Sequence, residues 1–400
     1  MANKYDVAVI GAGMIGSLTA SLLAQNNLSV ALIDPSNGCI TLSSPPCYDT
    51  RVSAISAASQ ALIEKADVWH RIPKDRLLPY RKMDVWDGLG TSNIQFQAET
   101  LGVPALGCMV ENAVLSDALN KKNDSLHKIH AYFGEKVVKF QHQDDLIAIT
   151  LSSGKKIQSQ LMIAADGAHS FVRKEAGFVC REWDYGHNAI VSTIEIDRSH
   201  ENTAWQAFGD EGILAFLPLP SVAGRYFASI VWSVPPKESE LLCSLDEAGF
   251  CQRLSYALSE RFTVLAELSS RQSIPLKQRH ATEYVKDRIA LVGDAAHTIH
   301  PLAGQGANIG FADVKALVDV VSNAYKREDD IGRSIVLRRY QRARMLNNLQ
   351  MTAGMETFKR LYATQTPLIV QMRNLGMNFI NHNSTIKRLV VDRAFGDRKA

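Results

Sequence analysis

The stretch from Asp6 to Gly16 restricts the fold of this chain more than any other, because an apolar run there breaks into closely spaced glycines. It predicts a β-strand, a tight turn and a helix. Gly11 permits the turn, Gly13 lets the backbone approach a phosphate, and Gly16 allows close helix packing. Ala12 lies in the same turn. Free N–H groups at the start of such a helix favour a dinucleotide pyrophosphate, although an ordinary glycine-rich turn is the alternative.

A second apolar run, at residues 30–33, extends this motif. It ends in Asp34, about 20 residues after the turn, where a carboxylate can accept a hydrogen bond from a ribose hydroxyl. A solvated aspartate at the end of a strand is the alternative. Together the two runs predict a Rossmann-like nucleotide-binding domain.

Two later apolar runs also deliver an aspartate to a turn. Residues 161–165 stop at Asp166, which precedes a glycine, and residues 288–292 stop at Gly293 and Asp294. A carboxylate at such a place can accept bonds from backbone or from a ribose, or it can belong to a purely structural turn.

The run at residues 288–292 continues into a loop and a helix predicted over about residues 307–324. The positive end of that helix suits an anionic ring such as reduced flavin. The loop and the helix start contain five further candidate cofactor contacts, Pro301, Gly304, Gln305, Gly306 and Asn308.

His297 and His300, close to Asp294, raise the alternative of a metal site. Pro301 and the surrounding small residues indicate a loop rather than a helix with paired ligands, and no further cluster of ligands is visible. We therefore predict no metal.

Arg51, after a long Ser/Pro/Cys-rich loop, can approach a pyrophosphate or a flavin edge, with a salt-bridged loop arginine as the alternative.

The middle of the chain reads mostly as strands. Alternation predicts a hairpin over residues 81–96 and strands over 136–140, 146–150, 189–196, 203–208, 215–220 and 225–234, whereas 110–119 and 241–268 read as helical. One apolar strand face here would either wall a cavity or pack against the sheet's own helices. The candidate substrate residues in this region are Phe216, Pro218, Ile230 and Trp232.

Charge and methionine are unevenly distributed. The net charge of +3 is too small to indicate nucleic-acid binding, but residues 341–400 carry ten Lys or Arg against three acidic residues. The same sixty residues contain five of the ten methionines. This segment suits an anionic lipid surface or a partner protein, or it covers the nucleotide domain as a helix.

Compartment follows from what the sequence lacks. No apolar stretch is long enough for a membrane-spanning helix, and the six cysteines include no CxxC pair. We expect a cytoplasmic protein with reduced thiols, peripheral at the inner face of the membrane through residues 341–400.

The three strand–turn motifs together resemble those of aromatic-ring flavoprotein monooxygenases, the para-hydroxybenzoate hydroxylase-like class. Within that class, residues 49–56, 109–112 and 293–306 are similar to the ubiquinone-biosynthesis hydroxylases. Residues 51–58, 79–81 and 203–206 most resemble the branch of that family that acts on demethoxy-ubiquinol. The resemblance covers most of the chain.

The resemblance implies a role for each candidate residue. Gly11, Gly13 and Gly16 would meet the FAD pyrophosphate, Asp34 the adenosine ribose, Val138 the adenine, Arg51 and Asn112 the FAD chain, Asp294 the ribityl chain, and Gly304 and Gly306 the isoalloxazine. Asp166 would serve a turn that FAD and NAD(P)H both approach. The class more often has Glu where this chain has Asp34, but the shorter side chain accepts the same bonds.

The implied activity is hydroxylation of the ring of a polyprenylated demethoxy-ubiquinol with NAD(P)H and O2, through a flavin peroxide. The cofactor carries the chemistry, and no side chain stands out as a catalytic base. Three alternatives stay open: an FAD-dependent dehydrogenase or reductase without oxygen activation, a hydroxylase of another ring position or of a small phenol, and a non-catalytic scaffold of a quinone-synthesis assembly.

The predicted fold is α/β (α+β). A Rossmann-like FAD-binding domain, formed by residues 1–75, 105–180 and 275–340, is interleaved with a mostly antiparallel β-sheet substrate domain, formed by residues 76–104 and 181–274. A basic, Met-rich helical segment, residues 341–400, follows and would contact the membrane or a quinone-synthesis complex. The oligomeric state does not follow from the sequence.

Overall fold

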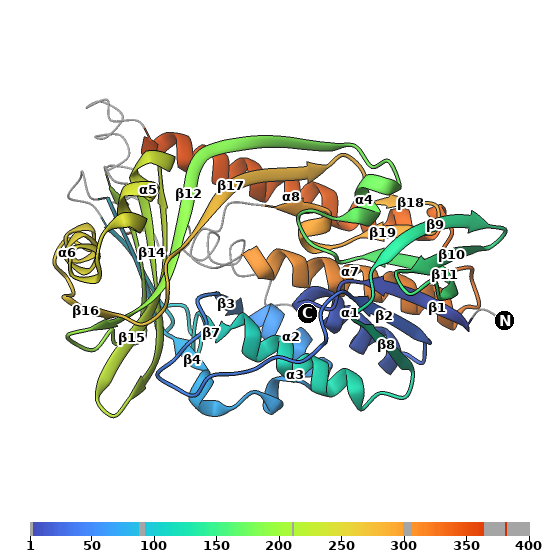
Figure 1. Ribbon diagram of the computed structural model, residues 1–400, viewed down its shortest axis with the longest axis horizontal. Helices are drawn as coiled ribbons and strands as arrows, with labels where there is room; N and C mark the ends of the chain where they lie inside the picture. The colour runs from blue at the N-terminus through green and yellow to red at the C-terminus, as the bar shows by residue number, and fades with distance from the viewer. Residues whose placement is uncertain (1–2, 88–92, 210–211, 299–305, 364–380, 382–400) are drawn as a thin grey trace.

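A computed structural model describes residues 3–87, 93–209, 212–298, 306–363 and 381 of the protein, with side chains through Met351 and at Asn381. Two large sheets lie at opposite ends of the elongated molecule, and a small sheet lies between them (Figure 1).

The first large sheet has the strand order β18-β19-β11-β1-β2-β8, with β10 and β9 continuing from β11. Its strands are β1 (Asn3–Ile10), β2 (Val30–Asp34), β8 (Ile129–Phe133), β9 (Val137–Gln143), β10 (Leu146–Leu151), β11 (Lys156–Ala164), β18 (Val285–Lys286) and β19 (Ile289–Leu291). The central pairs are parallel, and their apolar residues are buried, as helices on a sheet's faces require.

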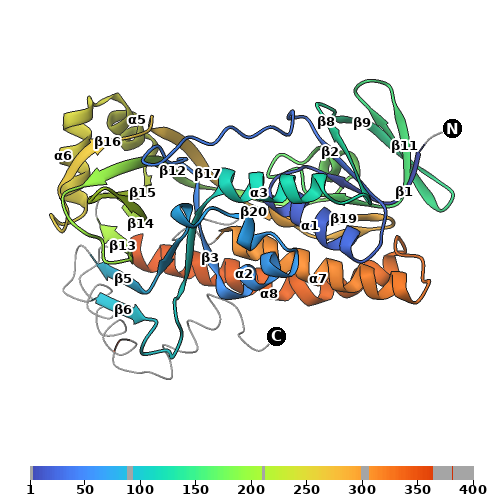
Figure 2. The ribbon, with the colours of Figure 1, turned by 90° about the horizontal axis from the view of Figure 1, so that it is seen from below.

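Helices pack around this sheet and beside one another (Figure 2). They are α1 (Met14–Gln25), α2 (Ala57–Lys65), α3 (Asn112–Asp124), α4 (Phe171–Glu175), α7 (Gly306–Lys326) and α8 (Ser334–Ala363). The predicted C-terminal helical segment thus begins at Ser334 rather than at residue 341. Apart from Asn381, its part beyond residue 363 lies outside the described residues.

The second large sheet has the order β20-β17-β12-β15-β14-β13-β5-β6, with β16 beside β12. Its strands are β5 (Lys82–Asp87), β6 (Asn93–Gln97), β12 (Cys180–Ile196), β13 (Thr203–Gly209), β14 (Gly212–Val222), β15 (Arg225–Val234), β16 (Val264–Glu267), β17 (Gln272–Ala281) and β20 (His297–Thr298). All its pairs are antiparallel except β13 with β5. Helices α5 (Pro236–Ser244) and α6 (Glu247–Ala257) cover one face.

The third sheet consists of β3 (Val52–Ser56), β7 (Gly107–Glu111) and β4 (Leu78–Tyr80). Its buried side chains share a cluster with Leu217, Leu219 and Phe227 of the second sheet. Short 3-10 turns complete the described fold: η1 (Trp69–Arg71), η2 (Lys74–Arg76) and η3 (Gly293–Ala295).

The architecture confirms the predicted fold class, and the predicted hairpin is formed by β5 and β6. Two details differ. The stretch 241–268 is not one helix: the backbone is extended at Leu245, the Asp246 side chain accepts a bond from the Gly249 N–H to start α6, and β16 follows. The predicted domain boundary between residues 274 and 275 falls inside β17, which belongs to the second sheet throughout.

Candidate functional site

Four neighbouring parallel strands deliver the predicted motifs to one edge of the first sheet. The strands stand in the order β19, β11, β1, β2, and they end level to within one residue, since Ile10 pairs with both Ala164 and Ile33, and Ala164 pairs with Leu291. The glycine turn follows β1, Asp166 follows β11, the Gly293 turn follows β19, and Asp34 ends β2. Ligands of such sheets bind outside these carboxyl ends.

The glycine turn is shaped as a cradle. Gly11 has φ +101°, and a Cβ there would lie 2.4 Å from the Ala165 carbonyl oxygen. A Cβ at Gly16 would lie 1.8 Å from the Gly11 oxygen, whereas one at Gly13 would meet nothing within 4 Å. Gly13 caps α1 without a side-chain bond, and the first turn contains no acidic residue. Its N–H groups are therefore available to a pyrophosphate.

Asp34 lies against this turn. Its Oδ2 accepts a hydrogen bond from the Ala12 N–H at 2.6 Å, and its Oδ1 accepts from the Ser36 N–H at 2.8 Å. A carboxylate has about four lone-pair sites, so acceptor capacity for a ribose hydroxyl remains. Val138, on β9, has a side chain that is 51% exposed, and the chain just before it, at Glu135, bonds to the Asp34 carbonyl at 3.2 Å.

Asp166 has one satisfied and one unsatisfied carboxylate oxygen. Its Oδ2 accepts from the Val172 N–H at 3.2 Å, while its Oδ1 is buried without a hydrogen-bond partner among the described residues. Burial raises the pKa of this carboxyl, opposed by bonds from the Ser170 side chain and the Val172 backbone. An orphaned acceptor at this edge suits a ligand that donates a hydrogen bond.

Asp294 is accessible to solvent and yet surrounded by protein. Burial raises the pKa of its carboxyl, and the charges of His297, Arg51 and Arg279 oppose that shift. Arg51 is exposed and near enough to act on Asp294, so the structure brings together two predicted contacts that are remote in sequence. Such a carboxylate is typical of a binding site.

Asn112 and Asn308 differ in how many hydrogen bonds their side-chain amides make within the protein. The Asn112 N–H bonds to the Arg51 carbonyl at 2.9 Å, and its Oδ1 accepts from Ser53 Oγ at 2.7 Å. Asn308 donates to the Ala54 carbonyl at 2.8 Å and accepts from a second backbone group of β3, the Ser56 N–H, at 2.9 Å. Asn308 therefore ties the start of α7 to β3.

The predicted flavin loop is only partly described. Gly306 begins α7, and a Cβ there would meet nothing within 4 Å. Pro301, Gly304 and Gln305, with His300, lie outside the described residues.

Comparison with known proteins identifies the family. Residues 4–352 match the family model described as FAD binding domain. The chain is 36% identical over 392 residues to the 3-demethoxyubiquinol 3-hydroxylase of Escherichia coli, covering 98% of each protein. It is 32% identical over 434 residues to the mitochondrial ubiquinone biosynthesis monooxygenase COQ6 of Xenopus tropicalis, covering 97% of this chain and 92% of that protein. The chain belongs to this family of FAD-binding monooxygenases.

Solved structures agree on the fold. The p-nitrophenol 4-monooxygenase PnpA of Pseudomonas putida superposes with a TM-score of 0.78 at 18% identity, over 100% of both chains. A Klebsiella pneumoniae HpxO variant complexed with FAD gives 0.75 at 19% identity, over 99% of each. The predictions of this monooxygenase family and of FAD as its cofactor are confirmed. The open glycine cradle, the uncapped α1 and the orphaned Asp166 oxygen fit FAD.

The predicted substrate wall of this monooxygenase requires a correction. Phe216, Ile230 and Trp232 are fully buried in a cluster with side chains of α5 and α6. Pro218 lies on the same face, because it pairs with Ala228, a member of that cluster. The alternative, packing of the sheet against its own helices, is what the structure shows. Alternation along a strand directs the neighbouring residues to the opposite face, where Leu217, Leu219 and Phe227 pack with the third sheet.

His297 has a carboxylate partner that the sequence analysis did not single out. Its Nε2 lies 2.5 Å from Oδ2 of Asp313 on α7. The residues that the structure describes contain no group of three potential metal ligands.

Asp313 and its partners Arg344 and Asn348 were not predicted, although the sequence contains a signal for Asp313. Asp313 lies four residues from both Ile309 and Leu317, on the buried stripe of α7. A charged residue on an apolar helical stripe indicates a buried partner, because an unpaired charge is rarely buried. Arg173, which follows the second motif in the sequence, was not predicted as a functional residue. It links that motif to the third, donating to the carbonyls of Ala168 at 2.7 Å and Ala295 at 2.9 Å.

Proposed function

We propose that this protein hydroxylates the aromatic ring of a polyprenylated demethoxy-ubiquinol, with NAD(P)H and O2 as co-substrates. The observation that carries the proposal is the similarity, over nearly the whole of both chains, to a hydroxylase of that name. The four strand ends that meet at one sheet edge support it, because they provide one continuous place for a long dinucleotide.

We assign the predicted contacts as follows. The glycine cradle and the α1 N-terminus hold the pyrophosphate, Asp34 the adenosine ribose, and Asp294 the ribityl chain. Val138 lies toward the adenine, and Asp166 serves the turn shared with the nicotinamide. Arg51 and Asn112 follow the FAD chain, whereas Asn308 acts through β3. Bound FAD supplies electron transfer from the nicotinamide and activation of oxygen.

We place the substrate on the inner face of the second sheet, that is, the face opposite to the one covered by α5 and α6. Val231, next to Trp232 on β15, is half-buried and packs with Tyr185, Ala189 and Leu276 rather than with α5 and α6. Ser229, on the same face, donates to the Thr50 carbonyl at 3.3 Å beside Arg51. An apolar face here orients a hydrophobic substrate and excludes water from the flavin edge.

Labelled oxygen tests the reaction. Holoenzyme is given NADH or NADPH, 18O2 and a short-chain demethoxy-ubiquinol, and mass spectrometry follows the quinone. We expect one 18O atom in the ring of the product and comparable consumption of nicotinamide. Nicotinamide oxidation without label in the product would favour the dehydrogenase alternative. In a parallel assay with a small phenol in place of the quinol, label in the phenol but none in the quinol would favour the soluble substrate.

Two neighbouring residues of β15 test the substrate face. Replacing Val231 by Trp fills the inner face, so KM for the quinol should rise about tenfold, the effect of a clash of roughly 1.4 kcal/mol, with FAD affinity unchanged. Ile230→Val is the matched control, because its cavity lies on the outer face and should lower only stability, by about 1 kcal/mol. An unchanged KM in V231W would place the substrate elsewhere.

A peripheral contact with an anionic membrane fits the outer surface of α8. Ile335, Leu346 and Leu349 are 66%, 62% and 44% exposed, and Arg338, Arg339 and Arg342 are exposed beside them. Residues 334–351 contain no acidic side chain. Apolar and basic residues together suit a charged lipid surface, from which a prenylated substrate would come. No helix in the described part of the chain is both long and apolar enough to cross a bilayer.

A further inference from the structure

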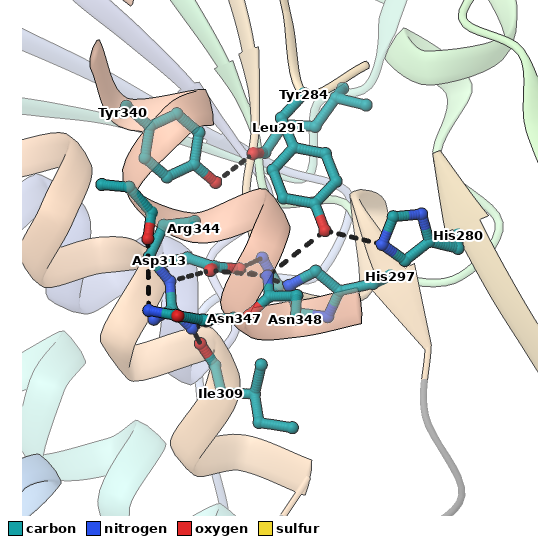
Figure 3. A network of polar contacts seen from close by, with 12 residues as sticks. His280, Tyr284, Leu291, His297, Ile309, Asp313, Tyr340, Arg344, Asn347 and Asn348 are labelled. Atoms are coloured by element: carbon teal, nitrogen blue, oxygen red, sulfur yellow. Dashed lines mark hydrogen bonds and ion pairs between the residues drawn. The ribbon is translucent and has the colours of Figure 1, made fainter. Parts of the chain in front are cut away.

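Asp313 is a fully buried carboxylate that joins two parts of the molecule (Figure 3). Its Oδ2 accepts a hydrogen bond from the Gly293 N–H at 3.2 Å and lies 2.5 Å from Nε2 of His297. Its Oδ1 accepts from Nε of Arg344 at 2.8 Å and from Nδ2 of Asn348 at 3.2 Å. One oxygen holds the turn that contains Asp294, and the other holds α8.

The charge of Asp313 is stabilised by neighbouring groups of opposite charge. Burial alone would raise the pKa of Asp313, but the charges of His297 and Arg344 and their hydrogen bonds outweigh it and lower that pKa. Arg344 is held further by the Ile309 carbonyl at 3.4 Å and by Asn348 Oδ1 at 2.7 Å. Because a buried ion pair adds little net stability over an apolar contact, the geometry that it fixes is its more informative consequence.

Residues on one face of α8 make hydrogen bonds around the strand–turn motif at Gly293. Tyr340, Arg344 and Asn348 follow one another at four-residue spacing, which places them on one helical face. The Tyr340 hydroxyl donates to the Leu291 carbonyl, at the end of β19, at 2.7 Å. Asn348 donates to the Tyr284 hydroxyl at 3.3 Å. The strand before Gly293 is thus tied to α8 directly, and the Gly293 turn is tied to α8 through Asp313.

We propose that Asp313 is a positioning residue that couples α8 to the Gly293–Asp294 turn and thereby sets the affinity and the midpoint potential of the bound flavin. Gly293 has φ +58° and its carbonyl accepts from the Ala296 N–H at 2.9 Å, so the turn is compact. Asp313 fixes both of its ends, at Gly293 and at His297, and hence the place of the Asp294 carboxylate. The inference rests on the proposed contact between Asp294 and the ribityl chain.

The test compares Asp313→Asn with the wild type as holoenzyme. Asn keeps the shape of the side chain but brings an N–H group among four donors, so the turn should shift. We expect the FAD dissociation constant, measured by flavin fluorescence, to rise roughly tenfold or more, as loss of hydrogen bonds to a charged group predicts. The flavin midpoint potential, measured by dye-linked reduction, should shift as well.

A second ion pair, between a buried arginine and a half-buried aspartate, supplies the control. Asp330 bonds to Arg288, at the opposite end of β19, at 2.6 Å and 3.0 Å. Asp330→Asn should lower the melting temperature and leave the FAD dissociation constant and the midpoint potential at wild-type values. If D313N and D330N lose FAD in proportion to their losses of stability, Asp313 is only structural and the proposal fails.

A milder pair of variants covers the case in which D313N does not fold. Arg344→Lys keeps the charge but loses the planar fork, and we expect a smaller shift of affinity and potential in the same direction. Asn347→Ala, on the exposed side of the same turn of α8, should shift neither. Wild-type values of both quantities in R344K would overturn the coupling.

Asp294→Asn distinguishes failure of the ribityl assignment from failure of the coupling through Asp313. If D294N binds FAD as the wild type does, the ribityl assignment fails and the proposed route fails with it. If D294N binds weakly while D313N binds normally, only the coupling through Asp313 is overturned.

Discussion

The pyrophosphate end and the ribityl end of the FAD site are built in different ways. At the first, the proposed contacts are backbone groups of one short stretch, and Asp34 reaches the turn from the adjacent strand. At the second, the Gly293 turn is held by a carboxylate of α7 whose other partners come from α8. The first end depends on the absence of side chains, and the second depends on a particular set of them.

The largest effect is expected from adding one methyl group to the pyrophosphate end. In Gly16→Ala the new Cβ would lie 1.8 Å from the Gly11 carbonyl oxygen and 3.1 Å from Ala165 Cβ. The turn and α1 must separate, so we expect FAD affinity to fall by about 100-fold or more, with a loss of several kcal/mol of stability. Isothermal titration with FAD and urea unfolding measure the two.

Gly13→Ala is the control for that variant. Its Cβ meets nothing within 4 Å in the protein, so the free energy of unfolding of the apoprotein should stay within about 1 kcal/mol of the wild type. FAD affinity should still fall, because the methyl group would occupy the approach of the pyrophosphate. Wild-type FAD affinity in G13A would contradict the assignment of the cradle.

This difference also explains what the sequence could predict. Glycine spacing and the strand-end aspartate lie within one short stretch, so Gly11, Gly16 and Asp34 are recognisable without a structure. The partners of Asp313 depend on which helix packs on α7, a choice made by distant residues. The signal, a charge on the apolar stripe of α7, indicates that a partner exists but not which one.

The substrate sheet shows the same limit. Alternation correctly groups Ile230 with Trp232, because side chains two residues apart share a face. It does not tell which face meets the cofactor, since that depends on where α5 and α6 pack. The break at Leu245 was likewise hidden within an apolar stretch, although Asp246 three residues before Gly249 is a helix-start signal.

An intermediate effect is expected for the ribityl end in the apoprotein. Asp313→Asn leaves Arg344 without its charged partner, so it should lose about 3 kcal/mol of unfolding free energy at pH 7. The pKa of Asp313 is lowered in the folded protein, so the carboxylate stabilises the fold above its ordinary pKa, about 3.9, and this contribution is lost as pH falls through the lower folded value. Urea unfolding at pH 3 to 7 measures the difference.

Asp294→Asn is the matched control with the opposite sign. The pKa of Asp294 is raised in the folded protein, so the carboxyl destabilises the fold increasingly as pH rises from about 3.9 through the raised value. At pH 7 the D294N apoprotein should therefore be as stable as the wild type or more stable. A loss in D294N as large as in D313N would mean that the two carboxylates serve the same structural purpose.

The smallest effect is expected from the outer side of α8. It tests whether this side of the helix contributes to the flavin site. Reversing charge at Arg338, Arg339 and Arg342 should weaken binding to anionic vesicles, because about 1 kcal/mol is contributed by each basic residue at such a surface, and added salt should weaken wild-type binding likewise. FAD affinity should not change, since these side chains face away from Asp313. Vesicle sedimentation and flavin fluorescence measure the two. Unaltered vesicle binding with normal FAD affinity would favour a protein partner at this surface, whereas weakened FAD affinity would show that both sides of α8 belong to the flavin site.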